Sequence, residues 1–383
     1  MKTILLFTDF SSGYSQNLLK GFVQYSTEFE LSWVFYRMPL AYRELHGDDG
    51  VALWAKQWKA DAVIALLDDV NLDVLNQLEI PIVTLNRKHA INGCNIDGDY
   101  FGTGVMAAEF FVKRGFSHFA WYGLKHAIWS RKRAVGFIRS LRKQGFTVSA
   151  LNNAPLKNEY WSFDTAILGK WLLSLPKPVA LFACDDYFAS QIIETCRMYN
   201  IAVPDDIAVL GVDNDELICK ISSPLLSSIV LDVQNGGYQA AGILRQLMDG
   251  EILQDSDIVI RPLWIETRKS TEKYVVDDKH IMKVIKYITE NYSAPISVAD
   301  IMKMVPLSRR ILEQRFKNLM GTTIYQYLLR YRIEQFASLL IKTDKPIYEL
   351  AKTCGLYGDY KNLRQTFRKF MKTTPQQYRK MTV

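Results

Sequence analysis

Short apolar segments alternate with helix-like segments through the first 268 residues, and this alternation is the feature that most restricts the fold of the chain. Strands that are buried on both faces of a sheet have nearly continuous apolar sequences. The expected strands are residues 4–7, 62–67, 80–85, 119–123, 179–183 and 207–212. The expected helices are residues 16–27, 104–114, 133–144, 188–198 and 236–248. We therefore predict an α/β domain with parallel sheets and right-handed crossover connections.

Polar and aromatic side chains follow several of these strands, where open α/β sheets bind their ligands. The candidates are Asp9, Tyr14, Asp99, Trp129, Arg133, Asp185 and Asp213. Carboxylates and an arginine fork can hydrogen-bond to vicinal hydroxyl groups, and an aromatic ring can cover the apolar face of a sugar. An Asp after a strand is also a common helix cap, and we expect that role for Asp186. Trp129, in a predicted loop, is as consistent with packing as with ligand stacking.

Residues 95–124 and 182–229 resemble the lactose-repressor-type sugar sensors. The resemblance covers residues 1–268 and implies a two-lobed, type I periplasmic-binding-protein-like domain. It places lobe 1 at about 1–99 and 231–260, and lobe 2 at about 100–230 and 261–268. By position it also implies sugar contacts for Arg133, Asp213 and Asp185, and puts Asp99 at a crossing between the lobes. Asp9 and Tyr14 are the contacts that we expect from lobe 1.

The positive charge of the chain is concentrated in its last part. Residues 277–383 contain 20 Lys and Arg residues but 9 Asp and Glu residues, a net charge of +11. Because the whole chain has a formal net charge of +7, residues 1–276 have a net charge of −4. A basic module beside a slightly acidic domain is typical of proteins that bind a polyanion such as DNA.

The basic part contains an internal repeat of two helices. Val298, Ile301, Met302 and Val305 form a helical apolar stripe, and Ile347, Leu350, Ala351 and Cys354 repeat it 49 residues later. Leu312, Phe316 and Leu319 form a second stripe, which Leu363, Phe367 and Phe370 repeat. Each copy predicts a short helix, a tight turn and a second helix, which is a helix-turn-helix motif. The motifs span about 298–319 and 347–370, and a long helix at about 323–342 separates them.

The second helix of each copy has a polar, mostly basic outer face. Arg and Lys can contact guanine edges or phosphates, and Asn and Gln can pair with adenine edges. The candidate DNA-contacting residues are Ser308, Arg309, Arg310, Glu313, Gln314, Lys361, Asn362, Arg364 and Gln365. We expect Ser308 to be a helix N-cap. Residues 307–316, 321, 327–340, 347–355, 367–370 and 374–379 resemble the arabinose-regulator family of double helix-turn-helix activators. We therefore predict an all-α DNA-binding domain at 281–383, joined by a linker at 269–280.

The remaining features exclude several classes of protein. The five cysteines include no C-x-x-C pair, so we expect neither a disulfide framework nor a zinc site, and no cofactor. No apolar segment approaches the ~20 residues that cross a bilayer. The first apolar segment is too short for a signal peptide. We therefore expect a soluble cytoplasmic protein without a membrane partner.

The chain places the sensor domain first and the double helix-turn-helix domain last. In this order of domains it resembles the bacterial xylose operon regulators over its full length. This resemblance implies a homodimeric, non-enzymatic transcription activator whose partners are double-stranded DNA, RNA polymerase and a monosaccharide, D-xylose being the first choice. The alternatives are another sugar such as arabinose or a hexose, and repression instead of activation. A periplasmic-type sugar-binding protein and a glycosidase with paired carboxylates are the rival classes.

Overall fold

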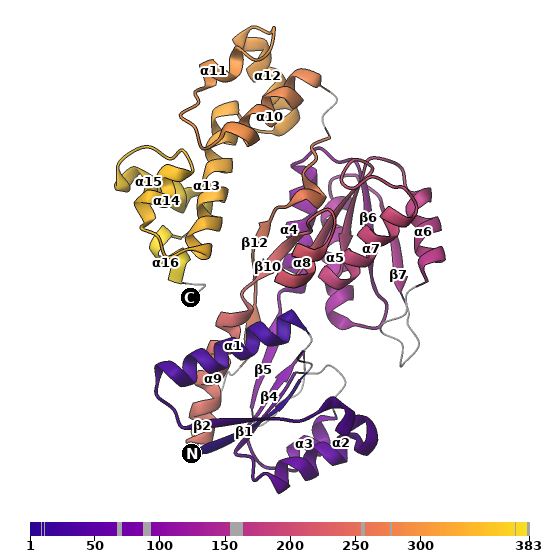
Figure 1. Cartoon of the computed structure of the whole chain (residues 1–383), viewed down its shortest axis with the longest axis vertical. Helices are drawn as coiled ribbons and strands as arrows, with labels where there is room; N and C mark the ends of the chain where they lie inside the picture. The colour runs from indigo at the N-terminus through magenta and orange to yellow at the C-terminus, as the bar shows by residue number, and fades with distance from the viewer. Residues whose placement is uncertain are drawn as a thin grey trace. The chain divides into compact units, whose positions relative to one another are not determined.

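The computed structural model describes residues 1–8, 10, 12–66, 71–86, 93–153, 164–253, 257–275, 278–371 and 373–380 (Figure 1). The chain divides into two compact units. The first unit comprises Met1–Ala108 and Phe119–Thr271. The second comprises Glu109–His118 and Glu272–Val383. Each unit has its own secondary structure and its own core, as the sequence pattern predicts.

The first unit contains two six-stranded sheets. The first sheet has the order β11-β5-β4-β3-β1-β2, and all its strands are parallel. Its strands are β1 (Lys2–Phe7), β2 (Trp33–Arg37), β3 (Ala62–Ala65), β4 (Ile82–Leu85), β5 (Gly93–Gly98) and β11 (Ile258–Ile260). Its helices are α1 (Gly13–Glu28), α2 (Leu40–Gln57), α3 (Leu72–Asn76) and α9 (Val233–Met248). Figure 1 shows α1 with α9 on one side of this sheet and α2 with α3 on the other.

The second sheet has the order β12-β10-β9-β8-β6-β7. Its strands are β6 (His118–Leu124), β7 (Val148–Asn153), β8 (Val179–Ala183), β9 (Ile207–Val212), β10 (Ser227–Leu231) and β12 (Pro262–Glu266). Strand β12 runs antiparallel to β10. Its helices are α4 (Tyr100–Val112), α5 (Ile128–Arg142), α6 (Thr165–Ser174), α7 (Asp186–Met198) and α8 (Glu216–Ile221). The two-lobed parallel α/β architecture is therefore confirmed.

The chain passes between the two sheets in three short segments that are bonded to each other. The amide of Asp99 donates to the carbonyl of Ile260 at 2.8 Å, and the amide of Asp232 donates to the carbonyl of Arg261 at 3.0 Å. Each of these residues lies just outside or at the end of a strand, so the crossings form one narrow strip of backbone. A strip of this kind is suited to act as a hinge between two rigid sheets.

Glycines let helices cross closely in both halves of this unit. A Cβ atom at Gly21 in α1 would lie 2.0 Å from the carbonyl oxygen of Gln234 in α9. A Cβ atom at Gly104 in α4 would lie 2.1 Å from the carbonyl oxygen of Arg133 in α5. These helix pairs therefore touch through their backbones, and α4 is held directly against the turn of α5 that carries Arg133.

The end of the first unit differs from the expected linker at 269–280. Lys269–Thr271 form a 3₁₀ turn in which Ser270 and Thr271 are fully buried. The hydroxyl of Ser270 donates to the carbonyl of Val209 at 2.7 Å. The first residues of the expected linker are therefore packed against the second sheet, because small hydroxyl side chains can be buried once they are hydrogen-bonded.

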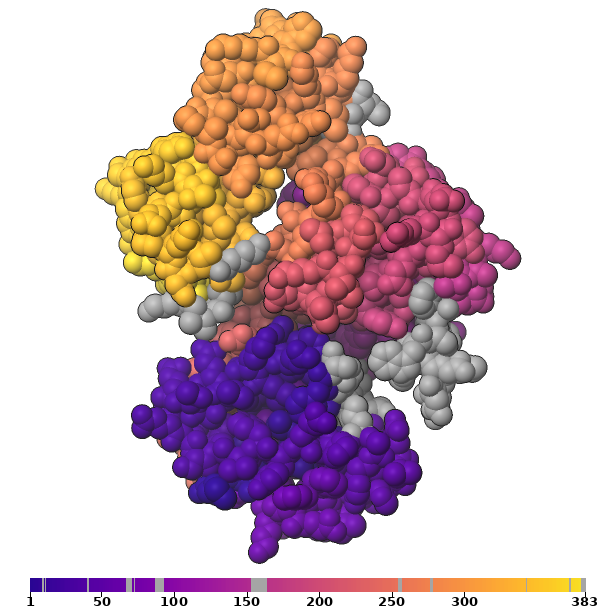
Figure 2. Space-filling view, viewed as in Figure 1, coloured from indigo at the N-terminus to yellow at the C-terminus, as the bar shows by residue number. Residues whose placement is uncertain are grey.

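The second unit is helical. Its helices are α10 (Lys279–Asn291), α11 (Val298–Met302), α12 (Arg309–Met320), α13 (Ile324–Lys342), α14 (Ile347–Thr353), α15 (Tyr360–Met371) and α16 (Pro375–Lys380). The pairs α11–α12 and α14–α15 are the two predicted helix-turn-helix motifs. In Figure 2 the first half of this unit (orange) and the second half (yellow) form two rounded bodies that adjoin each other. None of the helices in the described ranges is long and apolar enough to span a membrane.

Candidate functional site

Arg133 is the centre of a polar cluster at the carboxyl ends of β8 and β9. It lies on α5 and is 2% exposed. Its Nη1 donates to the carbonyl oxygen of Cys184 at 2.5 Å, and its Nη2 donates to Oδ1 of Asp213 at 3.2 Å. An arginine is buried only where partners of this kind compensate its lost hydration. The cluster therefore holds a charged donor in a fixed orientation.

Two aromatic rings flank the guanidinium group of Arg133. Its Cζ lies 5.2 Å from the ring centroid of Trp129 and 5.5 Å from that of Tyr100. The hydroxyl of Tyr100 donates to Oδ1 of Asn86, beyond β4 of the first sheet, at 2.5 Å. Trp129 lies in the first turn of α5, so its expected place in a loop was wrong. Tyr100 was missed by the sequence analysis, although it directly follows the candidate Asp99.

The turn after β9 presents Asp213 in an uncommon backbone conformation. Asp213 has a φ of 96°, in a region where Asn, Asp and Gly are tolerated best. The buried Asp186 supports this turn, because its Oδ2 accepts a hydrogen bond from the amide of Asp215 at 2.7 Å. Asp186 was expected to cap α7, but the cap is Asp185, whose Oδ1 accepts from the amide of Phe188 at 2.8 Å.

Burial and neighbouring charges shift the pKa values of Arg133 and Asp213 in opposite directions. Burial alone lowers the pKa of Arg133, but Asp213 and, less strongly, Tyr100 and Asp185 raise it above its ordinary value. Burial raises the pKa of Asp213, and Arg133 counteracts this effect. Burial raises the pKa of Asp185 to about 7, with a further contribution from the charge of Asp213. Acidic and basic groups therefore converge on a partly desolvated point, as expected of a ligand site.

The raised pKa of Asp185 predicts how stability depends on pH. Between its ordinary pKa of 3.8 and about 7, the folded chain keeps a proton that the unfolded chain has released. The free energy of unfolding should therefore fall as pH rises through this range, by roughly 1–3 kcal/mol, and level off above it. Urea unfolding at pH 5 and pH 8 measures this difference. Asp185→Asn keeps an acceptor for the amide of Phe188 and should reduce the pH dependence.

Glu194→Gln is the matched control for this prediction, because Glu194 is an exposed carboxylate on the same helix, α7. The control should keep the wild-type pH dependence. If Asp185→Asn also keeps it in full, the carboxyl of Asp185 does not titrate in this range and its assigned environment is wrong.

The remaining candidates of the first unit have different surroundings. Oδ1 of Asp99 accepts a hydrogen bond from the amide of Gly102 at 2.8 Å, so its side chain holds the first turn of α4. Tyr14 lies in the first turn of α1, whose N-cap is Ser12. Asp9 lies outside the described residues.

Lys132 adds a cation next to this cluster that the sequence analysis did not single out. Its Nζ lies 3.3 Å from Oδ2 of Asp97 on β5 and 5.5 Å from the ring centroid of Tyr100. Asp97 belongs to the first sheet and Lys132 to a helix of the second, so this ion pair links the two lobes beside Arg133. No signal in the local sequence identifies such a pair, because its partners are 35 residues apart.

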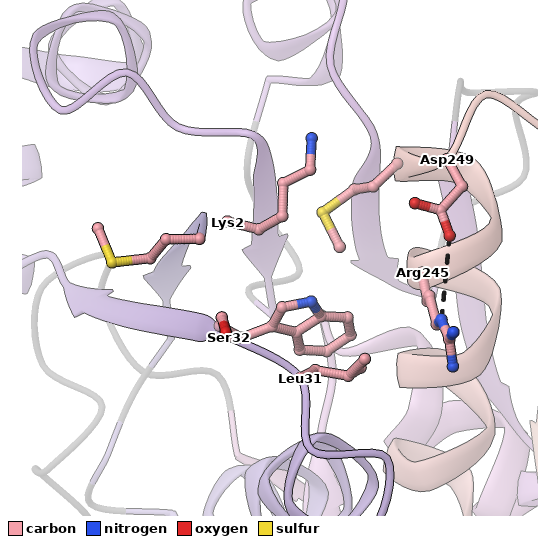
Figure 3. A pocket seen from close by; sticks show the side chains of 8 residues that line it. Lys2, Leu31, Ser32, Arg245 and Asp249 are labelled. Carbon is pink, nitrogen blue, oxygen red and sulfur yellow. Dashed lines mark ion pairs between the residues drawn. The ribbon is translucent and has the colours of Figure 1, made fainter.

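A different hollow lies in the first sheet, at the amino ends of β1 and β2 (Figure 3). Its volume is about 230 Å³, and Lys2, Trp33 and Arg245 are among its lining residues. Nε of Arg245 in α9 lies 3.9 Å from Oδ2 of Asp249, the C-cap residue of that helix. Ligands of open α/β sheets bind at the carboxyl ends of strands, so this hollow is not the expected site.

The second unit presents the predicted DNA-contacting residues on α12 and α15. Leu312 and Phe316 in α12, and Leu363 and Phe367 in α15, are buried and form the inner faces. The exposed candidates are Ser308, Arg309, Arg310, Gln314, Lys361, Asn362, Arg364 and Gln365, whereas Glu313 is half-buried. Each second helix therefore presents polar side chains to solvent, beside exposed apolar side chains at Ile311 and Leu319 of α12.

The two second helices begin differently. Ser308 occupies the N-cap position of α12 as expected, but its side chain makes no capping hydrogen bond there. In α15, Oδ1 of Asp359 accepts from the amide of Asn362 at 2.7 Å, and Oδ2 accepts from its side-chain amide at 3.1 Å. Ser308 would therefore lose no capping hydrogen bond if its hydroxyl bound a phosphate. Asn362 would have to break its side-chain hydrogen bond to Asp359 before it could pair with a base.

Comparisons with known proteins match both units. A family described as a periplasmic binding protein-like domain matches residues 108–271, and one described as a helix-turn-helix domain matches residues 301–381. The xylose operon regulatory protein of Haemophilus influenzae is 29% identical over 376 residues, which are 96% of this chain and 95% of that protein. That of Escherichia coli K12 is 31% identical over 336 residues, 85% of each chain. The chain belongs to the family of xylose operon regulatory proteins.

A solved structure supports this membership of the xylose operon regulatory family. The structure of the xylose-binding transcription activator xylR has a TM-score of 0.61 and 26% identity, and the match covers 99% of this chain and 98% of that one. The complex of the transcriptional regulator CelR with cellobiose, at 19% identity and a TM-score of 0.56, shows the sensor fold alone. The sequence prediction of a sugar-responsive, helix-turn-helix transcription regulator is therefore confirmed at the level of the family.

Proposed function

We propose that this chain is a non-enzymatic transcription activator that binds D-xylose in its first unit and double-stranded DNA in its second. The observation that carries the proposal is the buried Arg133 fork, held by Asp213 and placed between two aromatic rings at the carboxyl ends of strands. The relatives named above are regulators of a xylose operon, and the solved relative is described as xylose-binding.

The chemistry of the cluster suits a neutral sugar. A pentose offers vicinal hydroxyl groups that can donate to the carboxylates of Asp213 and Asp185 and accept from an arginine N–H. The Nε–H of Arg133 is buried and has no partner within the described ranges, which is unusual for a buried donor and favours a partner supplied by a ligand. The ring of Trp129 can cover the C–H side of the sugar.

Sugar binding is proposed to favour a closed arrangement of the two lobes. The cluster takes Arg133 from the second lobe, and Tyr100 joins it to Asn86 of the first. A ligand that contacts both lobes in one arrangement selects that arrangement. In a cytoplasmic homodimer, this selection would set how two DNA-binding units face an operator and RNA polymerase.

The α12 and α15 helices are proposed to enter successive major-groove segments of duplex DNA. Their exposed Lys and Arg residues supply phosphate contacts, which make affinity fall steeply with salt. Their exposed Gln residues can reach base edges. We therefore assign most of the affinity to charge and the selectivity to a few amide side chains.

A thermal-shift panel of pentoses and hexoses tests the sensing function. D-xylose at about 100 times its Kd should add roughly 2.7 kcal/mol to the free energy of unfolding. If L-arabinose or a hexose gives the largest shift in melting temperature, that sugar replaces D-xylose as the effector, and no shift with any sugar would refute sugar sensing.

A turnover assay separates a sensor from a glycosidase, because a sensor leaves the sugar chemically unchanged after long incubation. A mobility shift with a selected duplex, with and without the sugar, tests DNA binding and the direction of the response.

A further inference from the structure

Helix α13 carries an arginine in the middle of its buried face. Ile324 and Leu328 belong to the core of the first helix-turn-helix half, and Phe336 and Leu340 are buried against the second half. Arg332 occupies the position between them at the same four-residue spacing, which places it on the same face of the helix. An apolar side chain there would simply continue the core, so the guanidinium group needs a separate explanation.

The guanidinium group of Arg332 binds a short segment of the first half. Its Nε donates to the carbonyl oxygen of Tyr292 at 2.7 Å, and its Nη2 donates to that of Ala294 at 2.8 Å. These carbonyls follow α10, where helix ends leave carbonyl groups without helical partners. A planar fork that engages two acceptors fixes direction as well as distance.

The turn of the second helix-turn-helix contacts the same segment. The hydroxyl of Tyr357 donates to the carbonyl oxygen of Ser293, between the two acceptors of Arg332, at 3.1 Å. Gly355 has a φ of +71°, and a Cβ atom there would lie 2.4 Å from the carbonyl oxygen of Tyr292. Three consecutive carbonyls of the first half are therefore engaged from α13 and from the second half.

The relation between the two halves decides which DNA can be bound by both. Successive major-groove segments lie about 34 Å apart, one helical turn of 10–10.5 base pairs. One inserted base pair moves the second segment by about 3.4 Å and also rotates it around the duplex axis. A pair of recognition helices selects one spacing only if their relative position is held.

We propose that Arg332, together with Tyr357 and Gly355, is a positioning group that fixes the spacing of the two DNA segments read by α12 and α15. The inference rests on the proposed binding of duplex DNA by both helices. A merely structural role, such as capping α10, would change stability or overall affinity but would leave the preferred spacing unaltered.

The test measures spacing preference on the full chain. The probe is a duplex that the wild-type chain selects from a random library, together with versions in which the two protected segments are one base pair closer or further apart. Arg332→Met keeps the length and apolar stem of the side chain but removes its donors, so the helix should still fold. Tyr357→Phe removes one hydroxyl from an exposed ring, and Tyr325→Phe, an exposed tyrosine on α13, is its matched control.

Wild-type protein and Tyr325→Phe should bind the selected spacing much more tightly than the altered ones. Arg332→Met should lose about 10-fold in affinity on the selected duplex and little on the others, because the second helix then binds without a preset position. Tyr357→Phe should also lose affinity for the selected duplex, by a smaller factor than Arg332→Met. Arg332→Lys, which keeps the charge but not the fork, should recover only part of the preference.

The possible failures are distinguishable. If the wild-type chain selects no duplex, the proposed function itself fails, and the inference fails with it. If it selects a duplex and Arg332→Met keeps the wild-type spacing preference, the inference alone is refuted. An equal loss of affinity at every spacing would assign Arg332 to a phosphate contact or to stability, which also refutes it.

Discussion

Asp213→Asn is expected to abolish most of the stabilisation that the effector sugar gives to this protein. The substitution removes a charge that Arg133 holds at 3.2 Å, while Asn tolerates the φ of 96° at this position. Hydrogen bonds to charged groups contribute about 1.5–3 kcal/mol, so Kd should weaken by roughly 10- to 100-fold. At a sugar concentration of about 100 times the wild-type Kd, a 100-fold weaker Kd reduces the stabilisation from roughly 2.7 to about 0.4 kcal/mol.

The control for this substitution is Asp164→Asn. Asp164 is exposed and caps α6 by accepting hydrogen bonds from the amides of Ala166 and Ile167. It is therefore also an aspartate at a helix start, but it takes no part in the Arg133 cluster. This variant should keep the full shift in melting temperature with sugar. If sugar raises the melting temperature of Asp213→Asn as much as that of the wild type, the sugar binds elsewhere.

Arg133→Ala should also lose the response to sugar, but with a second effect on the free protein. Asp213 would be left half-buried without its partner, and breaking a buried pair costs about 3–5 kcal/mol. The free chain should therefore unfold at lower denaturant concentration than the Asp213→Asn chain. Urea unfolding without sugar separates this loss of stability from the loss of binding.

The sequence predicts best those elements whose cause is local. The expected strands at 179–183 and 207–212 agree with β8 and β9 at both ends, because uninterrupted apolar segments coincide with strands buried on both faces. Strand β5, Gly93–Gly98, was missed because its sequence is mixed. Asn95 is buried there and its Oδ1 accepts a hydrogen bond from Thr84 at 3.4 Å, a partner that no local pattern reveals.

The starts of helices are also hard to predict where no local capping signal marks them. The expected start of α5 at residue 133 is later than the observed one at Ile128, which misplaced Trp129 in a loop. The N-cap residue of this helix is Ala127, whose side chain makes no capping bond, so the sequence carries no capping signal. At α7, two adjacent aspartates both fit a cap, and a contact with Asp215, 29 residues away, determines that Asp186 has another role.

The polar cluster around Arg133 was anticipated in part, and the reason is again the distance between partners in the sequence. Arg133 and Asp213 were candidates by position and resemblance, and the structure brings them together, while their contact with sugar stays a prediction. Tyr100, Lys132 and Arg332 were not found, because each acts through partners more than ten residues away in the sequence. Residue type alone does not separate a guanidinium group that binds carbonyls inside the fold from one that faces solvent.

On the outer faces of α12 and α15, replacing amide and basic side chains is expected to produce two different losses of DNA binding. Gln314→Ala and Gln365→Ala should each cost about 1–3 kcal/mol on the selected duplex and relax the preference at one base position. Arg309→Ala and Arg364→Ala should weaken binding to all duplexes and reduce the slope of log K against log salt by about 1 each. All four side chains are exposed, so these variants should fold normally.

Lys286→Ala is the control for charge, because Lys286 is an exposed cation on α10, outside the second helices of the two motifs, and lies 3.8 Å from Glu290. Titrations of each variant at several salt concentrations, on the selected duplex and on one with a changed base, measure both effects. Lys286→Ala should leave the salt slope as in wild type, since a cation that faces no phosphate releases no counterion. If Lys286→Ala lowers the salt slope as much as Arg364→Ala does, the basic residues attract DNA through their summed charge and not through individual phosphate contacts. If the glutamine variants lose the same affinity on both duplexes, α12 and α15 do not read base edges.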